Sequence, residues 1–234
     1  MLKELIIKVF KKTFLLLKGR DLEVSDSLSF KDCILYFYHK GLMTAIRGII
    51  VRPFIKSDGL IFIGKSVRIK FKHKLMLGKN CYIGDFSLID CMSIGGISLG
   101  NNVTLREHAW VQLSSNLFNP GESITIGDNT YIGPYCKLGA AAPIKIGSFC
   151  QIGANVSFVA ENHQFNPGSE ICKQSITRKG IVVKNDCWIG NNVTILDGVT
   201  IGNGCVIGAG AVVTKSIPDQ AIAVGVPAIV IKYR

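Results

Sequence analysis

The sequence predicts an all-β protein, a left-handed parallel β-helix, and two repeating features carry this prediction. The first is an aliphatic residue followed by glycine, which recurs mostly at a spacing of six, as at 77 and 83, 126 and 132, or 146 and 152. One unbroken ladder is formed by Ile189, Ile195, Ile201 and Ile207. A period of six fits neither an α-helix nor a hairpin, and fixed internal repeats are typical of stacked coils.

The second feature is a small residue four positions after the aliphatic one. If each coil has three short strands and three sharp turns, both residues point into a prism. The glycine then lies near a corner, where a positive φ or a close backbone approach favours it. Five of the eight cysteines take the small inward position: Cys81, Cys136, Cys150, Cys187 and Cys205. We interpret them as small buried hydrophobes rather than as disulfides or zinc ligands.

The repeat divides the chain into two parts. Residues 56–234 carry the repeat and are expected to form the β-helix. Residues 1–55 lack the repeat and are expected to be mainly helical. They would close the lower end of the β-helix, because a solenoid needs capped ends. Turn-rich residues 114–121 and the long segment 160–180 interrupt the ladder, and residues 216–234 are expected to close the upper end. Loops that project from a rigid scaffold often carry function.

Composition excludes several classes of protein. With 48% hydrophobic and 18% charged residues, the chain is too apolar to be disordered. The net charge of +11 favours an anionic partner, such as a membrane surface or a phosphate-rich cofactor. No RNA-binding or zinc-finger signature accompanies the charge, so we expect no nucleic-acid partner. Without a signal peptide or an apolar run of spanning length, we expect a cytoplasmic protein.

The first twenty residues are basic and amphipathic, with Lys3, Lys8 and Lys11 among apolar residues such as Leu5 and Phe10. Two interpretations stay open for residues 1–20. They contact an anionic membrane from the cytoplasmic side, or they form a helix packed under the first coil.

The second half of the chain resembles a known family. The motifs that carry the resemblance are Asn185-Asp186-Cys187-Trp188-Ile189-Gly190, then Ile207-Gly208-Ala209-Gly210-Ala211, and finally Gly225-Val226-Pro227-Ala228. They resemble the hexapeptide-repeat acetyltransferases, and among these the sugar and polysaccharide O-acetyltransferases of bacterial surface-glycan pathways. The resemblance covers roughly residues 60–234. It implies a homotrimer whose active sites lie between neighbouring prisms, with acetyl-CoA along each cleft.

The resemblance implies that His163, at the start of the long loop, is the general base. A hydroxyl is a poor nucleophile at neutral pH, and histidine is the side chain suited to deprotonate it. Glu161 would orient the imidazole through a hydrogen bond. Two alternatives to that role remain: a backbone carbonyl orients the ring, or Glu161 is a solvated loop acid.

The positions that match the family's coenzyme site are Asn191, Ala209, Thr214, Lys215 and Lys232. Ala209 would offer backbone groups to the pantetheine amides, and the two lysines would meet phosphates. Trp188 follows an inward cysteine and should face outward, lining either the cleft or the contact between subunits.

Some positions depart from the family pattern. Gly133 stands where many sugar acetyltransferases have an asparagine, and residues 140–142 (Ala-Ala-Ala) replace a sugar-contacting aspartate. These departures argue against a simple galactoside or maltose acceptor. Ile229 stands where the family often has arginine. His73, His108 and His163 lie too far apart in sequence for a three-histidine zinc site, so no metal is expected.

The sequence therefore predicts an acetyl-CoA-dependent O-acetyltransferase that acts on a sugar hydroxyl of a bacterial surface polysaccharide or its precursor. The same chemistry on another small acceptor, such as an antibiotic, serine or an amino sugar, is the first alternative. A non-catalytic trimeric solenoid that serves as a scaffold is the second.

Overall fold

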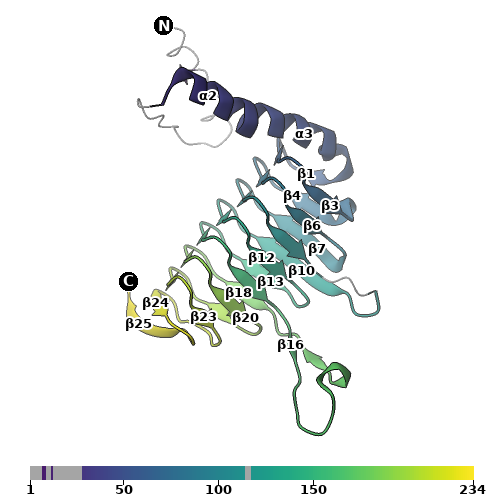
Figure 1. Cartoon of the computed structure of the whole chain (residues 1–234), viewed down its shortest axis with the longest axis vertical. Helices are drawn as coiled ribbons and strands as arrows, with labels where there is room; N and C mark the ends of the chain where they lie inside the picture. The colour runs from purple at the N-terminus through teal and green to yellow at the C-terminus, as the bar shows by residue number, and fades with distance from the viewer. Residues whose placement is uncertain (1–6, 9–11, 13–27, 114–116) are drawn as a thin grey trace.

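The computed structural model describes residues 7–8, 12, 28–113 and 117–234. Three parallel sheets, which we name A, B and C, form the walls of a prism, and the chain visits them in the order A, B, C in every coil. Helices lie at one end of this prism and the C-terminal strands at the other (Figure 1). The predicted left-handed parallel β-helix with a helical N-terminal segment is confirmed.

Each wall is built from one strand of each coil. Sheet A contains β1 (Lys56–Ser57), β4 (Leu75–Leu77), β7 (Ser93–Leu99), β10 (Gly121–Ile126), β13 (Ile144–Ile146), β18 (Ile181–Val183) and β21 (Thr200–Ile201). Sheet B contains β2 (Phe62–Ile63), β5 (Tyr82–Ile83), β8 (Thr104–Leu105), β11 (Tyr131–Ile132), β14 (Gln151–Ile152), β19 (Trp188–Ile189), β22 (Val206–Ile207), β24 (Ala221–Val224) and β25 (Ile229–Tyr233). Sheet C contains β3 (Arg68–Lys70), β6 (Leu88–Asp90), β9 (Trp110–Gln112), β12 (Lys137–Gly139), β15 (Ser157–Val159), β20 (Thr194–Leu196) and β23 (Val212–Val213).

The glycines of the ladder allow the coils to stack. A Cβ added to Gly84 would lie 2.4 Å from the amide nitrogen of Glu107 in the next coil, and one added to Gly153 would lie 2.7 Å from that of Asn191. The glycines are therefore required by close approach. The positive φ belongs to the residue two places after each glycine, for example Phe86 at 59° and Asn155 at 54°.

The inward cysteines are buried and free, as predicted. All five donate through Sγ to a carbonyl oxygen of the next coil at 3.0 to 3.1 Å: Cys81 to Gly100, Cys136 to Gly153, Cys150 to Lys184, Cys187 to Gly202 and Cys205 to Pro218. Burial raises the pKa of the Cys136 thiol to about 11. These thiols are thus packing groups with satisfied S–H donors rather than reactive nucleophiles.

A helical arm closes the lower end of the prism. It consists of α2 (Phe30–Tyr36), the π-helical turn η1 (Phe37–Leu42), α3 (Met43–Val51) and the 3-10 turn η2 (Arg52–Phe54). Ser29 and Asp32 form a capping box at its start. Among the residues that the structure describes, no helix has the length and apolar character needed to cross a bilayer. The predicted membrane contact of residues 1–20 lies largely outside these residues.

One buried contact and one ionic contact fasten the arm to the prism. Gly48 lies so close to the first coil that an added Cβ would be 1.9 Å from the carbonyl oxygen of Ile61. Lys40 donates to Glu107 Oε1 at 2.7 Å and to the Tyr82 hydroxyl at 3.2 Å. Arg106 Nε also donates to Glu107, at 2.8 Å. Glu107 thus joins the arm to the second and third coils.

Glu107 should make the stability of the chain depend on pH. Partial burial acts to raise the pKa of Glu107, but hydrogen bonds from Arg106 and Lys40 outweigh it and lower the pKa to about 2. The unfolded value is about 4.3. The stabilisation is therefore complete above the unfolded pKa and is lost as the pH falls through the folded pKa.

We expect Glu107→Gln to reduce the free energy of unfolding at pH 7 by about 1–3 kcal/mol, because two cationic donors lose a charged acceptor. Denaturant titrations at pH 7 and at lower pH would measure this loss, which should shrink between about pH 4.5 and pH 2. Glu122→Gln, at an exposed site, is the matched control and should change stability by less than about 0.5 kcal/mol. A loss that is the same at every pH would contradict this role of Glu107.

Candidate active site

Both interruptions of the ladder leave the prism at the same corner, where sheet C passes to sheet A. The first is the connection from β9 to β10, and the second is the connection from β15 to β18. The second contains the hairpin of β16 (Asn162–His163) and β17 (Ile176–Thr177), and the short helix η4 (Ile171–Lys173) at its tip. Figure 1 shows this hairpin projecting well beyond the wall of the prism.

The hairpin has two faces with different side chains. His163 pairs with Ile176, and Gln164 N–H donates to Ser175 O at 3.0 Å. Because side chains alternate along a strand, His163 and Glu161 share one face, and Gln164 and Ser175 lie on the other. The predicted catalytic histidine is exposed, as expected for a base that meets a substrate from outside the chain.

Glu161 is paired with an arginine that the sequence analysis did not single out. Arg178 Nη2 lies 3.4 Å from Glu161 Oε2, and Arg178 Nη1 donates to Asn119 Oδ1 at 2.6 Å. Among the described residues, no hydrogen bond joins Glu161 to His163. The Glu161–Arg178 pair thus lies at the base of the hairpin, and Arg178 also ties the hairpin to the neighbouring loop through Asn119.

A tight corner of the intervening coil separates the two loops that Arg178 joins. That corner is residues 140–143, and Ala141 is only 7% exposed even though it lies at the surface of the prism. The Arg178 side chain is itself only 19% exposed, and its buried Nε has no hydrogen-bond partner within the described chain.

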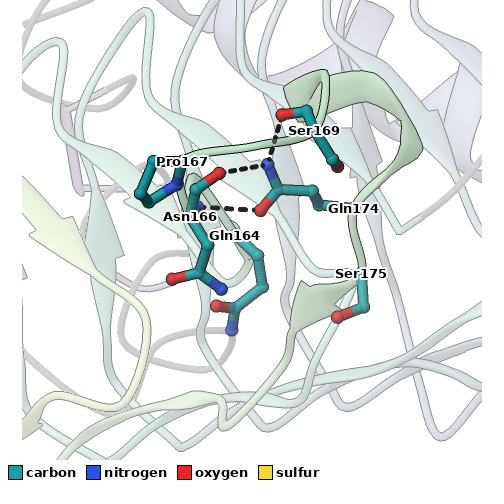
Figure 2. A pocket seen from close by; sticks show the side chains of 6 residues that line it. All are labelled: Gln164, Asn166, Pro167, Ser169, Gln174 and Ser175. Carbon is teal, nitrogen blue, oxygen red and sulfur yellow. Dashed lines mark hydrogen bonds between the residues drawn. The ribbon is translucent and has the colours of Figure 1, made fainter.

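A hollow of about 340 Å³ lies at the tip of the hairpin (Figure 2). Gln174 braces it, because its side chain donates to the carbonyl oxygens of Asn166 and Ser169 and accepts from Asn166 N–H. Gln164 and Ser175 also line it, and they belong to the face opposite His163. The hollow is therefore separate from the surface on which the histidine lies.

The expected coenzyme residue Ala209 lies where the ladder ends. In lower coils the carbonyl of the equivalent residue accepts from the next coil, as Ala154 O accepts from Asn192 N–H and Asn191 O from Gly210 N–H. The amide and carbonyl of Ala209 make no hydrogen bond within the described residues. Ala209 is exposed, so both groups are open to an amide-bearing ligand.

Two other positions are used by the coil stacking itself. Asn191 Oδ1 accepts from Ala154 N–H at 2.7 Å, which leaves only its amide group for a ligand. A Cβ on Gly133 would lie 2.4 Å from the carbonyl oxygen of Gly153, so an asparagine would not fit there. An oxyanion donor must therefore come from another position.

The remaining coenzyme candidates are exposed but lie on two walls. Trp188 is 60% exposed on sheet B, three strand spacings or about 14 Å from Lys232 along the same wall. Thr214 and Lys215 follow β23 on sheet C and are also exposed. The structure thus places these residues around the upper end of the prism, whereas His163 projects from a different corner.

The other two ladder-region histidines have separate surroundings. His108 is stacked between Phe86 and Tyr135, at ring-centroid distances of 5.3 and 4.7 Å. His73 lies in η3 (Lys72–Lys74) next to the first coil. Within residues 28–113 and 117–234, no three histidine, cysteine or acidic side chains gather as a metal site would require.

The stacked six-residue repeats, and the hairpin that leaves the corner between sheets C and A, are typical of a hexapeptide-repeat transferase. A family model described as bacterial transferase hexapeptide (six repeats) matches residues 180–215. A second, described as the hexapeptide repeat of succinyl-transferase, matches residues 75–106 and 123–158.

Comparison with known proteins defines the family more closely. WbbJ of Escherichia coli K12, named as a lipopolysaccharide biosynthesis O-acetyl transferase, is 32% identical over 146 residues, which are 59% of this chain and 72% of WbbJ. A Mycobacterium tuberculosis protein named as an acetyltransferase is 31% identical over 188 residues, or 79% of this chain. The match spans only 54% of that relative's length. The chain belongs to the hexapeptide-repeat acetyltransferases.

Solved structures of low identity show the same fold. The polysialic-acid-specific acetyltransferase NeuO aligns with a TM-score of 0.56 at 24% identity, covering 77% of this chain and 75% of NeuO. A hexapeptide-repeat acetyltransferase from Vibrio cholerae, in complex with acetyl coenzyme A, aligns with a TM-score of 0.50 at 21% identity. That alignment covers 95% of this chain and 97% of the other.

We expect Arg178→Ala to loosen the hairpin that carries His163, because Glu161 and Asn119 lose their shared donor. Hydrogen exchange at the amide of Gln164, which donates across the hairpin to Ser175 O, should become about tenfold faster or more, as expected for the loss of a charged hydrogen bond. Lys179→Ala removes a neighbouring exposed charge and is the matched control. Unchanged exchange in the Arg178 variant would show that the arginine does not hold the hairpin.

Proposed function

We propose that this chain is an acetyl-CoA-dependent O-acetyltransferase that modifies a sugar hydroxyl. The observation that carries the proposal is the exposed His163 on a braced hairpin. The end of the coil ladder also supports the proposal, because the amide and carbonyl of Ala209 have no partner in a further coil and are available to the pantetheine amides. Membership of the acetyltransferase family and the acetyl coenzyme A complex of the Vibrio cholerae relative support the choice of coenzyme.

In the proposed reaction, His163 accepts the proton of the sugar hydroxyl as the oxygen attacks the thioester carbonyl of acetyl-CoA. The new C–O bond gives a tetrahedral oxyanion, which backbone N–H donors stabilise. The C–S bond then breaks, and the coenzyme thiolate takes the proton from the His163 imidazolium. Glu161 contributes through its ion pair with Arg178, which fixes the hairpin relative to the prism.

The coenzyme would follow the upper end of the prism. Lys215 and Lys232 are exposed cations that meet its phosphates, and Thr214 and the free amide of Asn191 add hydrogen bonds. Trp188 offers an exposed aromatic wall beside them. Binding of the phosphates should weaken as salt is added, since exposed charges are screened.

The proposed active site needs two chains. In one prism His163 leaves the corner between sheets C and A, whereas Ala209 lies at the corner between sheets B and C and Trp188 on sheet B. A homotrimer in which the hairpin of one chain reaches the coenzyme residues of its neighbour brings these groups together. The site is therefore shared between subunits in this proposal.

The acceptor in this proposal is a bacterial surface polysaccharide or its precursor, modified in the cytoplasm at the inner face of the membrane. The name of WbbJ, which refers to lipopolysaccharide biosynthesis, and the glycan specificity of NeuO support it. Acetylation of another small acceptor uses the same histidine and coenzyme site, so an acceptor screen distinguishes the two. A non-catalytic scaffold would have no affinity for the coenzyme.

Calorimetric titration with acetyl-CoA tests the coenzyme site directly. We expect saturable binding that is unchanged after EDTA treatment, because none of the proposed coenzyme contacts uses a metal ion. Lys215→Ala should weaken binding by about tenfold or less, as expected for one exposed phosphate contact. Absence of binding at millimolar coenzyme would favour the scaffold, and loss of binding after EDTA would require a metal.

The role of His163 is tested by replacing it with alanine. We expect kcat to fall by about two to four orders of magnitude with little change in acetyl-CoA affinity, because general base catalysis is lost while the coenzyme contacts remain. His73→Ala, at an exposed histidine beside the first coil, is the control and should keep full turnover. Turnover that survives in the His163 variant would remove this residue from the mechanism.

A further inference from the structure

We propose that the helical arm and the lowest coils form a docking surface for an anionic lipid membrane. We call it the basal face and define it as the outward side of residues 28–54 together with the exposed cations of residues 56–74. The proposal makes no use of coenzyme binding or of His163. It stands or falls separately from the proposed transferase activity.

The arm presents an apolar stripe on the side that faces away from the prism. Leu35, Tyr38, Leu42, Ile46 and Ile49 are 41 to 61% exposed and follow one another at spacings of three or four residues, which puts them on one side of the rod. Other large exposed apolar residues of the arm are Ile34, Tyr36, Ile50 and Phe54. Contiguous apolar surface of this kind marks an interaction site.

The stripe is not the side that packs on the prism. The buried residues of α3 are Thr44 and Gly48, and Gly48 is the one that approaches the first coil. Lys40, which makes the ionic contact with Glu107, lies one turn before Thr44. Thr44, Gly48 and Lys40 thus face the prism, where Val51 also packs against the core, and no residue of the stripe is buried.

Charge is concentrated at the same end of the molecule. Residues 1–84 contain 17 lysines and arginines and 6 acidic residues, whereas residues 85–234 contain 10 of each. The whole net charge of +11 therefore belongs to the first 84 residues. The described part of this region, residues 28–84, contains eleven cations and two carboxylates, one of which, Asp32, is held in the capping box. Lys40 and Lys70 are paired with carboxylates of later coils, Glu107 and Asp90, and the remaining cations exceed the acids.

The cations and the apolar stripe meet at the end of the arm. Arg52 and Lys56 are exposed on either side of Phe54, and Lys72 Nζ lies 5.1 Å from the centre of the Phe54 ring. Arg68 and Lys70 continue the exposed cations along the first coil of sheet C. The basal face thus combines aliphatic, aromatic and cationic side chains with almost no acid.

This combination fits a lipid surface better than the other candidate partners. A nucleic acid would match the cations but would leave the aliphatic stripe in water. A second copy of this chain would cover the stripe but would bring two strongly cationic ends together. An anionic bilayer accepts both, because aliphatic and aromatic groups enter the interface and the cations meet lipid headgroups.

Vesicle flotation of the full-length chain tests the proposal. We expect binding to vesicles of phosphatidylcholine with phosphatidylglycerol, and little binding to phosphatidylcholine alone or in high salt. Ile49→Asn with Ile50→Asn, and separately Arg52→Glu with Lys56→Glu, should each weaken binding by at least about tenfold. Mass by light scattering should be unchanged in both variants.

Matched controls keep the test specific. Ile229→Asn with Ile231→Asn changes equally exposed isoleucines at the opposite end, and Lys137→Glu with Lys145→Glu reverses two exposed charges in the middle of the prism. Both should bind vesicles as the parent does. The proposal would be overturned if the parent protein did not bind vesicles, or if the basal variants bound them as well as the parent does. A smaller mass of the Ile49/Ile50 variant would also overturn it, because the stripe would then be an interface between copies of the chain.

Discussion

The structure depends on one constraint, the stacking of each coil directly on the next at the spacing of a β-sheet. At most positions of the two regular corners this spacing leaves no room for a Cβ, as the 2.4 Å approach at Gly84 shows, although Asp58, Arg106 and Lys184 interrupt the series of glycines. Those corners have the same length in every coil, so chain insertions are confined to the third corner. Both loops therefore leave the prism at one edge, two coils apart, where a single arginine reaches across the tight corner between them.

The parts of the fold that follow from this constraint could be predicted from the sequence. Ile189, Ile195 and Ile207 are buried, and the inward cysteines are buried and free, because one short repeat determines each local environment. The need for glycine was predictable as well. The residue with positive φ could not be predicted. It lies two places after the glycine, and Asn, Phe, His and Tyr all occupy that position without a common pattern.

The contacts around His163 could not be predicted in the same way. Arg178 meets Asn119 across 59 residues, and a repeat pattern says nothing about side chains outside it. The sequence offers Glu161 either as the partner of the histidine or as a solvated loop acid. The carboxylate instead pairs with Arg178, which lies beside it only because β16 and β17 form a hairpin.

The two ends of the prism show why function gathers where the repeat stops. Inside the ladder the strand amides and carbonyls are paired with neighbouring coils, and the inward apolar side chains are buried. At the upper end Ala209 has no coil above it, so its polar groups remain open. At the lower end the arm covers the first coil with Gly48 and Thr44 and carries its own apolar residues on the outside. A solenoid that needed only a cap would bury that stripe or replace it with polar residues, so the exposed stripe beside a cationic surface is the feature that a cap alone does not explain.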